Sequence, residues 1–286
     1  MRRLPVALGP ILGLILGLIG LAPRGFAADY ELPVLRGSSP FVPAYPTYFR
    51  WEGFYVGGQL SYGNANANFS AATQPLVAFS LRELVLEAQA APSRWRVLGV
   101  ADTGSAGFGA YTGYNAQWDN AIVGVEFNYT HSSFNAVAPS SPIERLVPAG
   151  AYTYDVFLTA NGSMRVEDFA TVRARFGWAM DNIMPYATLG LAVGRADLEL
   201  STSVSGTQTG PNPSPPPATL VVPFSFTQGQ TKNSAFLFGY AGGAGFELAL
   251  TRNLIGRLEY EYIQWSPVWQ ITSHLHMGRV GLGYKF

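Results

Sequence analysis

The chain of 286 residues has no cysteine and little charge. Without cysteine it can form no disulfide, no thiolate nucleophile and no cysteine-ligated metal site. Charged residues make up 13% of the sequence, whereas soluble proteins usually carry about 25%. The 18 basic and 18 acidic side chains balance, and no cluster of Lys and Arg occurs, which argues against a nucleic-acid partner. These deficits argue against a soluble enzyme.

Long apolar runs are also scarce, and the one that exists is N-terminal. Arg2 and Arg3 precede the apolar residues 4–22, and residues 25–27 give a small-x-Ala pattern. This order predicts a cleaved signal peptide over residues 1–27 and export of the rest. An uncleaved anchor is the alternative, because about 20 apolar residues span a bilayer. Residues 28–50 contain four prolines and are predicted to form a Pro-rich periplasmic linker.

From Gly53 onward, apolar and small residues alternate with a period of two, which predicts β-strands. Tight turns are expected at Asp119-Asn120, Asp181-Asn182 and residues 251–253, since Asn and Asp tolerate positive φ. Residues 64–103, 132–167 and 199–233 are expected to be long connections, and 265–273 a medium one. The eight predicted strands are 53–63, 104–117, 121–131, 168–180, 183–198, 234–250, 254–264 and 274–286.

The two faces of these strands differ in charge. In 121–131, for example, Val123 and Val125 alternate with Gly124 and Glu126. An uncharged face suits lipid, where Lys or Arg at the midplane costs about 2–4 kcal/mol. A soluble barrel that carries a ligand would instead be apolar inside and polar outside. Only a closed barrel satisfies all strand hydrogen bonds in hydrocarbon. The sequence therefore predicts an all-β fold, an eight-stranded antiparallel up-and-down transmembrane β-barrel over residues 51–286.

The charged face should then line the lumen. An eight-stranded barrel is just wide enough for side chains to fill it, and buried charges must pair to offset desolvation. We therefore predict a lumen closed by paired charges; an ion path along the same polar column is the alternative. Turn lengths place Gly113 opposite Glu126, Gly190 opposite Arg173, and Glu247 opposite Arg257. The predicted network is Glu126, Arg173, Arg175, Glu247, Arg257, Glu259, Glu261, Arg279 and Lys285.

The C-terminus has a pattern of its own. Arg279, Gly281, Tyr284 and Phe286 place a polar residue, a glycine and two aromatics at alternating positions of the last strand. This pattern resembles the C-terminal signal that the bacterial outer-membrane barrel-assembly machinery reads. An ordinary strand ending in Phe is the alternative. The resemblance implies delivery to the cell outer membrane.

Residues 51–58, WEGFYVGG, resemble the opening of small alphaproteobacterial outer-membrane barrels, a family of opacity-protein-like immunogenic porins and haemin-binding proteins. Residues 113–115, 170–177 and 185–190 look like that family's second, fourth and fifth strands. The resemblance covers 51–286, and the first long connection looks like a rhizobial-type subgroup. It implies the barrel fold and outer-membrane location, and it leaves the function open.

Three histidines are the remaining candidate ligands. His131, His274 and His276 all fall at the end of the barrel that carries the long connections. Imidazole binds haem iron or divalent metals, and haemin binding occurs in the family. No carboxylate spacing completes a metal site, so we predict solvated histidines and no cofactor, with haem binding as the alternative.

An outer-wall enzyme is a further alternative. Lipid A deacylases among small barrels use a His and a Ser two residues apart, the spacing of His131 and Ser133. A Ser nucleophile needs a base that a third group orients, and the sequence offers no carboxylate on that face, because Glu126 has the opposite parity.

We therefore predict a structural or surface-interaction role rather than an enzyme. Expected partners are outer-membrane lipid, lipopolysaccharide and the assembly machinery, with host or surface ligands at the long connections. A narrow channel, haemin binding and lipid A modification remain the alternatives.

Overall fold

The computed structural model describes residues 49–211 and 219–286. The predicted signal peptide (1–27) lies outside the described residues, as does the linker (28–50) except for its last two positions. Among the described residues, no helix has the length and apolar character needed to cross a bilayer. The strands are β1 (Gly53–Asn68), β2 (Val100–Trp118), β3 (Ala121–Val137), β4 (Ile143–Ala149), β5 (Tyr152–Trp178), β6 (Ile183–Pro211), β7 (Thr219–Ala249), β8 (Leu254–Val268) and β9 (Ile271–Lys285).

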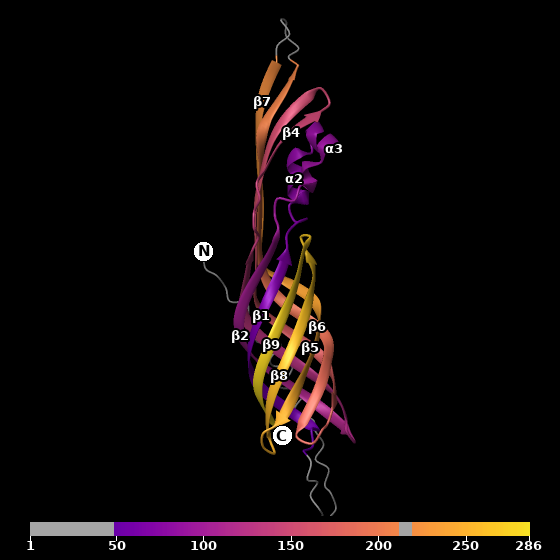
Figure 1. Ribbon diagram of the computed structural model, residues 1–286. Coiled ribbons are helices and arrows are strands. Elements are labelled where there is room, and N and C mark those ends of the chain that lie inside the picture. Colours follow the sequence, from indigo (N-terminus) through magenta and orange to yellow (C-terminus); the bar gives the residue numbers. More distant parts are fainter. Residues whose placement is uncertain (1–48, 212–218) are drawn as a thin grey trace, which may run out of the picture. The chain divides into compact units, whose positions relative to one another are not determined.

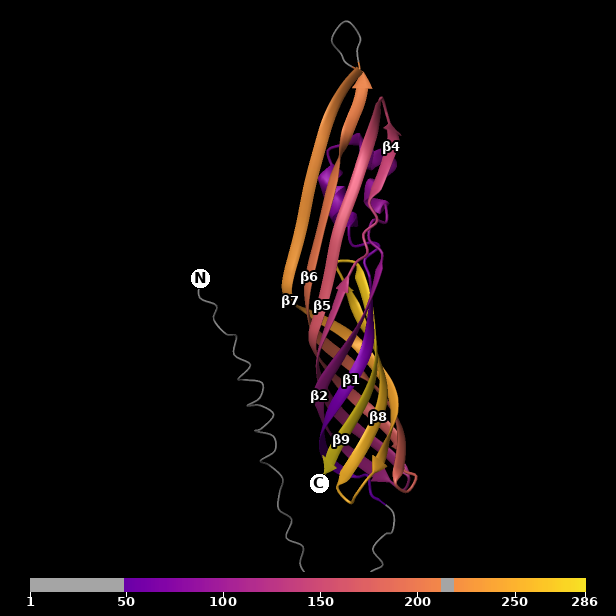
Figure 2. The ribbon, with the colours of Figure 1, turned by 60° about the vertical axis from the view of Figure 1, so that its left-hand side comes forward.

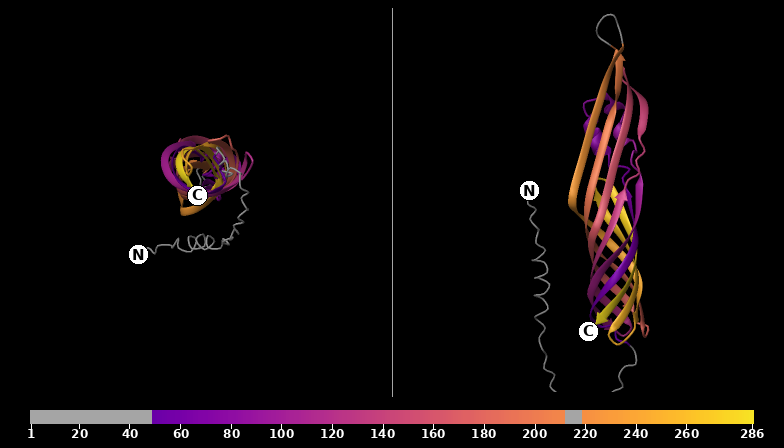
Figure 3. Two further views of the ribbon diagram at one scale, coloured as in Figure 1. Left: turned by 90° about the horizontal axis from the view of Figure 1, so that it is seen from below. Right: turned by 90° about the vertical axis from the view of Figure 1, so that its left-hand side faces the viewer.

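Eight of these strands close into a ring. Each of β1, β2, β3, β5, β6, β7, β8 and β9 pairs antiparallel with the next, and β9 returns to β1. Seen along its axis the ring is closed (Figure 3). The predicted fold class is confirmed. The remaining strand among those given above, β4, pairs with β5 and lies beyond the ring (Figure 1).

The tight turns lie where the sequence predicts them. Asp119 and Asp181 both adopt φ of 50°, the left-handed region that Asp and Asn enter more readily than most residues. These turns join β2 to β3 and β5 to β6. The expected medium connection 265–273 is wrong, because β8 and β9 continue to a two-residue turn at Trp269 and Gln270.

The expected long connections 132–167 and 199–233 are also mostly strand. β5, β6 and β7 continue well past the ends of β8 and β9 and form a sheet beyond the ring (Figure 2). We call this sheet, made by residues 143–166, 197–211 and 219–235, the extension. Alternation persists through it, with Val156, Leu158, Leu198 and Leu200 buried on one face. The apolar face of a sheet must be buried against another element. The prediction of long connections included no element that could do this.

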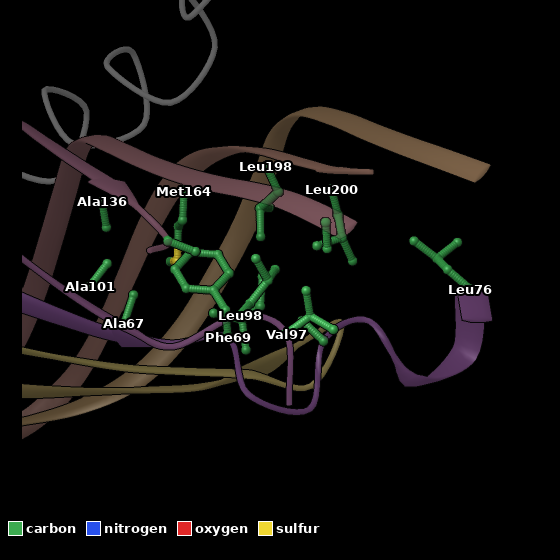
Figure 4. Packing of buried hydrophobic residues seen from close by; sticks show 14 of the residues in the cluster. Ala67, Phe69, Leu76, Val97, Leu98, Ala101, Ala136, Met164, Leu198 and Leu200 are labelled. Carbon is green, nitrogen blue, oxygen red and sulfur yellow. The ribbon is translucent and has the colours of Figure 1, made fainter. Parts of the chain in front are cut away.

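The cover comes from residues 69–99, which the sequence analysis left as a connection. They contain α2 (Gln74–Leu81), α3 (Val85–Ala90) and the short 3₁₀ helix Pro92–Arg94. α2 buries Leu76, Val77 and Leu81 and lies against β6 and β7. Phe69, Val97 and Leu98 fill the space beside Met164, Leu198 and Leu200 (Figure 4). The extension and the adjoining part of the ring thus share one continuous apolar core.

Outside the ring the face is apolar, as parity predicts. Val125, Leu189, Leu191 and Phe236 are each at least 60% exposed. Such a continuous band is what a membrane barrel presents to hydrocarbon.

Candidate functional site

The lumen of the ring gathers most of the predicted charges. The observed pairing places Gly113 opposite Glu126, Gly190 opposite Arg173 and Glu247 opposite Arg257. The predicted register is therefore confirmed at these positions. Glycine is needed opposite the large side chains, because a Cβ at Gly245 would lie 2.9 Å from the Tyr186 hydroxyl and 3.0 Å from the Glu259 Cα.

Glu126 and Glu259 are the centres of the network. Glu126 accepts a hydrogen bond from Arg257 at 2.6 Å and also pairs with Arg173. Glu259 accepts from Arg173 at 2.7 Å and from Arg279 at 3.1 Å. All five side chains are buried. Each carboxylate thus links guanidinium groups from opposite sides of the ring.

Two further glutamates complete the network, Glu247 nearer the short turns of the barrel and Glu261 nearer the extension. Glu247 lies 2.8 Å from Arg175 and 2.7 Å from Arg257. Glu261 lies 2.7 Å from Arg173 and also pairs with Arg279. Four arginines and four glutamates therefore neutralise one another within the lumen, as buried charges require.

The prediction that Lys285 belongs to the charge network is wrong. Its ammonium group donates to the backbone carbonyl of Glu52 at 3.0 Å and pairs with no carboxylate among the described residues. Six residues separate it from Arg279, a rise of about 20 Å along a strand. It therefore lies at the turn end of the barrel, and without it the lumen charges balance.

Three tyrosines belong to the network but were not predicted from the sequence. The Tyr55 hydroxyl donates to Glu126 at 2.9 Å, and the Tyr186 hydroxyl donates to Glu259 at 2.7 Å. Arg257 lies 3.7 Å above the Tyr111 ring, and Arg175 lies 3.8 Å above the Tyr186 ring. The signal available in the sequence was the register across the strands. Tyr55 stands opposite Gly113, which itself stands opposite Glu126, and Tyr186 stands opposite Gly177 and Gly245 on the lumen face.

Above the charges, the lumen becomes apolar. Met277 contacts Arg279, whose Nε lies 3.2 Å from the thioether sulfur. Together with Met277, the side chains of Ile263, Trp265 and Leu275 are buried in the same core that fills the extension. A cavity at this level, lined in part by Ala67, Met164 and Trp265, has a volume of about 20 Å³, roughly the space of one water. We call this level the apolar layer.

The predicted assembly residues divide between the two faces. Arg279 and Gly281 face the lumen, whereas Tyr284 and Phe286 are 49% and 67% exposed on the outer wall. The Phe286 ring lies beside Phe54 and Tyr284. Only the aromatic pair is therefore available to another protein on the lipid side.

Deleting Phe286 should lower the yield of folded barrel in the outer membrane, because it removes the terminal aromatic of this pair. The measurement is the folded fraction by heat-modifiable gel mobility in membrane fractions, with Phe286→Tyr as the control that keeps an aromatic. An unchanged yield would mean that the terminal residue is no assembly signal.

The histidines do not converge. His131 Nδ1 lies 2.7 Å from Asp168 Oδ1, and Tyr129 donates to the same oxygen at 2.7 Å. His276 Nδ1 lies 2.5 Å from the Tyr260 hydroxyl, and the His274 ring is 5.3 Å from that of His276. Within residues 49–211 and 219–286, no group of three or more His, Asp or Glu is placed to hold a metal ion.

Asp168 corrects the sequence analysis, which found no carboxylate for His131 on the outer wall. It stands directly opposite His131 on the neighbouring strand β5. The prediction weighed only Glu126, which is on the same strand as His131. The backbone N–H of Ser133 donates to Ser105 Oγ. Among the hydrogen bonds of the described residues, none joins the Ser133 hydroxyl to His131. The outer wall thus places a carboxylate beside His131, while Ser133 is bonded through its backbone N–H to Ser105.

Comparison with known proteins shows the family of the chain. The family model described as "Outer membrane protein beta-barrel domain" matches residues 41–286. The 25 kDa outer-membrane immunogenic protein of Brucella ovis is 28% identical over 271 residues, which are 94% of this chain and 94% of that protein. The 22 kDa outer membrane protein of Rhizobium leguminosarum bv. viciae is 26% identical over 75% of this chain and 64% of its own length. The crystal structure of OprG from Pseudomonas aeruginosa aligns at a TM-score of 0.35 with 11% identity, over 84% of this chain and 98% of that one.

Proposed function

Because the chain belongs to the outer membrane protein β-barrel domain family, we propose that it is a closed outer-membrane barrel that acts as a structural support for a surface-interacting extension. The ring anchors the protein in lipid. The charge network and the apolar layer close the lumen. The extension reaches outward to lipopolysaccharide or to other molecules at the cell surface.

The observation that supports this proposal is that two kinds of buried side chains succeed one another along the lumen, first the charge network and then the apolar layer. An ion entering the charge network would have to displace ion pairs in a low dielectric. It would then meet the apolar layer, and apolar constrictions exclude water and ions. Two successive barriers of opposite character favour closure over the narrow-channel alternative.

The refolded protein should therefore show no steady conductance in planar bilayers. Single-channel recording measures this directly, with protein unfolded before addition as the control for leakage caused by detergent. Stepwise, reproducible openings from the folded sample alone would refute the closed lumen and support the channel alternative.

The extension should face the cell exterior, since the short turns of such barrels are periplasmic. The chain has no cysteine, so a single introduced thiol reports its side of the membrane. A membrane-impermeant maleimide should label Ser266→Cys, near the turn between β8 and β9, on intact cells. Asn120→Cys, at the opposite end, should react only after permeabilisation; the reverse pattern would invert the orientation.

Neither catalysis nor haem binding is the function that we propose. A nucleophilic serine needs its base within hydrogen-bonding reach, and among the described residues no hydrogen bond joins Ser133 to His131. His131 is separated from His274 and His276 by β2 and β1. The arrangement of these groups therefore supports the structural role more than either alternative.

A further inference from the structure

β7 presents a long unpaired edge. It pairs with β6 from Thr219 onward, but its ladder to β8 begins only at Gly239. Within the described part of the chain, residues 219–238 therefore have a strand neighbour on one side only. Figure 2 shows β7 as the outermost strand of the extension. Free N–H and C=O groups along such an edge are a template for another strand.

This edge carries few of the devices that usually protect one. Residues 219–231 contain no charged side chain, and Leu220, Val221 and Val222 are 46%, 55% and 44% exposed. Pro223 and Lys232 are the two protective residues in the segment. Proline is tolerated in sheets where its ring nitrogen faces away from the neighbouring strand. From Pro223, the odd-numbered residues within 219–231 should therefore direct their N–H groups to the free edge.

A cleft lies beside the middle of this edge. Its volume is about 310 Å³, and it lies between the C-terminal end of α2 and the inner face of β7. Phe79, Leu84 and Phe226 give it apolar walls, and Arg82, Glu83 and Gln228 form its polar part. Phe79 is 54% exposed, with the Arg82 guanidinium 4.1 Å above its ring. A strand added to β7 would place alternate side chains on this inner face, because successive side chains point to opposite faces.

We propose that the β7 edge and this cleft form a site for β-strand addition. The ligand is an extended, uncharged segment of another protein that runs antiparallel to β7 and carries an apolar side chain at every second position. Backbone hydrogen bonds would supply affinity, and the cleft would select one apolar side chain. The uncharged edge matches an uncharged strand. This inference rests on the proposed surface-interaction function and names its partner class.

A second copy in the same membrane does not fit the site. Both copies would have the same end outward, so their β7 strands would run in the same direction. Edge-to-edge pairing would then be parallel, whereas every ladder of this sheet is antiparallel and antiparallel pairs are the more stable per residue. A strand from a different protein can approach in the antiparallel direction.

The test measures binding of labelled eleven-residue peptides to the refolded full chain in micelles, by fluorescence anisotropy. Three peptides alternate Ser or Thr with Leu, Val or Phe, and a fourth has Lys at the apolar positions. At least one apolar peptide should bind saturably and the Lys peptide should not. Empty micelles correct for partitioning into detergent. Failure of all three apolar peptides would overturn the proposal.

N-methylation of the binding peptide distinguishes strand addition from simple apolar capture. Methyl groups on alternate residues can be placed in two phases, and only one phase blocks N–H groups that face β7. That phase should weaken binding about 10-fold or more, since it removes several backbone hydrogen bonds at once. Equal effects of the two phases would contradict the proposal.

The protein side has a matched pair of variants. Thr227→Pro should remove an edge N–H and weaken binding about fivefold or more, whereas Thr227→Val keeps that group and should bind like the unsubstituted chain. Heat-modifiable mobility verifies that both variants fold. Equal binding by both, or self-association that displaces the peptide, would overturn the proposal. Conductance on the same preparation separates the failures: openings refute the closed lumen, and lost peptide binding refutes this site alone.

Discussion

Replacing Glu247 with alanine should lower the free energy of unfolding by about 3–5 kcal/mol, because it leaves buried charge without its partner. Glu247 lies 2.8 Å from Arg175 and 2.7 Å from Arg257, and all three side chains are buried. Its loss gives a neutral network one excess positive charge. Urea unfolding of the barrel refolded in lipid vesicles measures the change.

The double variant Glu247→Ala with Arg257→Ala should recover part of this loss, because it restores neutrality. Recovery should be incomplete, since Arg257 also bonds Glu126 at 2.6 Å and lies over Tyr111. Glu199→Gln, an exposed carboxylate change on β6, is the matched control and should stay near zero. A neutral Glu247→Ala would show that the network adds no stability and would remove the argument for a charge-closed lumen.

Replacing Trp265 with alanine should cost about 3–5 kcal/mol, the usual range for a large aromatic removed from a packed core. Trp265 is 3% exposed and packs edge-on against Phe169, with ring centroids 6.2 Å apart. It also fills the space beside Gly194, where a Cβ would lie 2.9 Å from the indole. The same unfolding measurement applies, and the m-value reports whether two-state behaviour persists.

Phe157→Ala is the control for this variant. Phe157 is an aromatic residue on the outward face of the extension and is 43% exposed, so its truncation leaves no enclosed cavity. Its effect should be clearly smaller than that of Trp265→Ala. Similar losses at the two sites would mean that the apolar layer is not a packed core, and the second barrier in the lumen would lose its basis.

The ring and its register could be predicted because they depend on local features. Side-chain direction alternates with a period of two, so one charged residue such as Glu126 identifies the face of its whole strand. Turn length then fixes the register: the two-residue turn at Asp119 sets Gly113 opposite Glu126. Both properties are contained in about 15 consecutive residues.

The extension could not be predicted in the same way. Residues 132–167 and 199–233 have alternating patterns, but β-bulges between Val166 and Asp168 and between Ala196 and Leu198 separate these patterns from those of the ring strands. A bulge adds a residue and shifts the parity. The apolar face above it also depends on cover from residues 69–99, which are distant in sequence. The free edge of β7 and its cleft follow from this arrangement.

The sequence by itself determined the closed barrel, its charged interior, its lipid face and the register across each short turn, because these follow from parity and turn length. Beyond the Glu247–Arg257 pair, which turn length predicts, only the tertiary structure decided which charges meet. Arg173 bonds Glu259 across 86 residues, Lys285 lies outside the network, and Asp168 faces His131. The physical reason is that contacts across the lumen depend on strand tilt and on the depth of each residue along the barrel axis, and neither quantity is encoded in the pattern of a single strand.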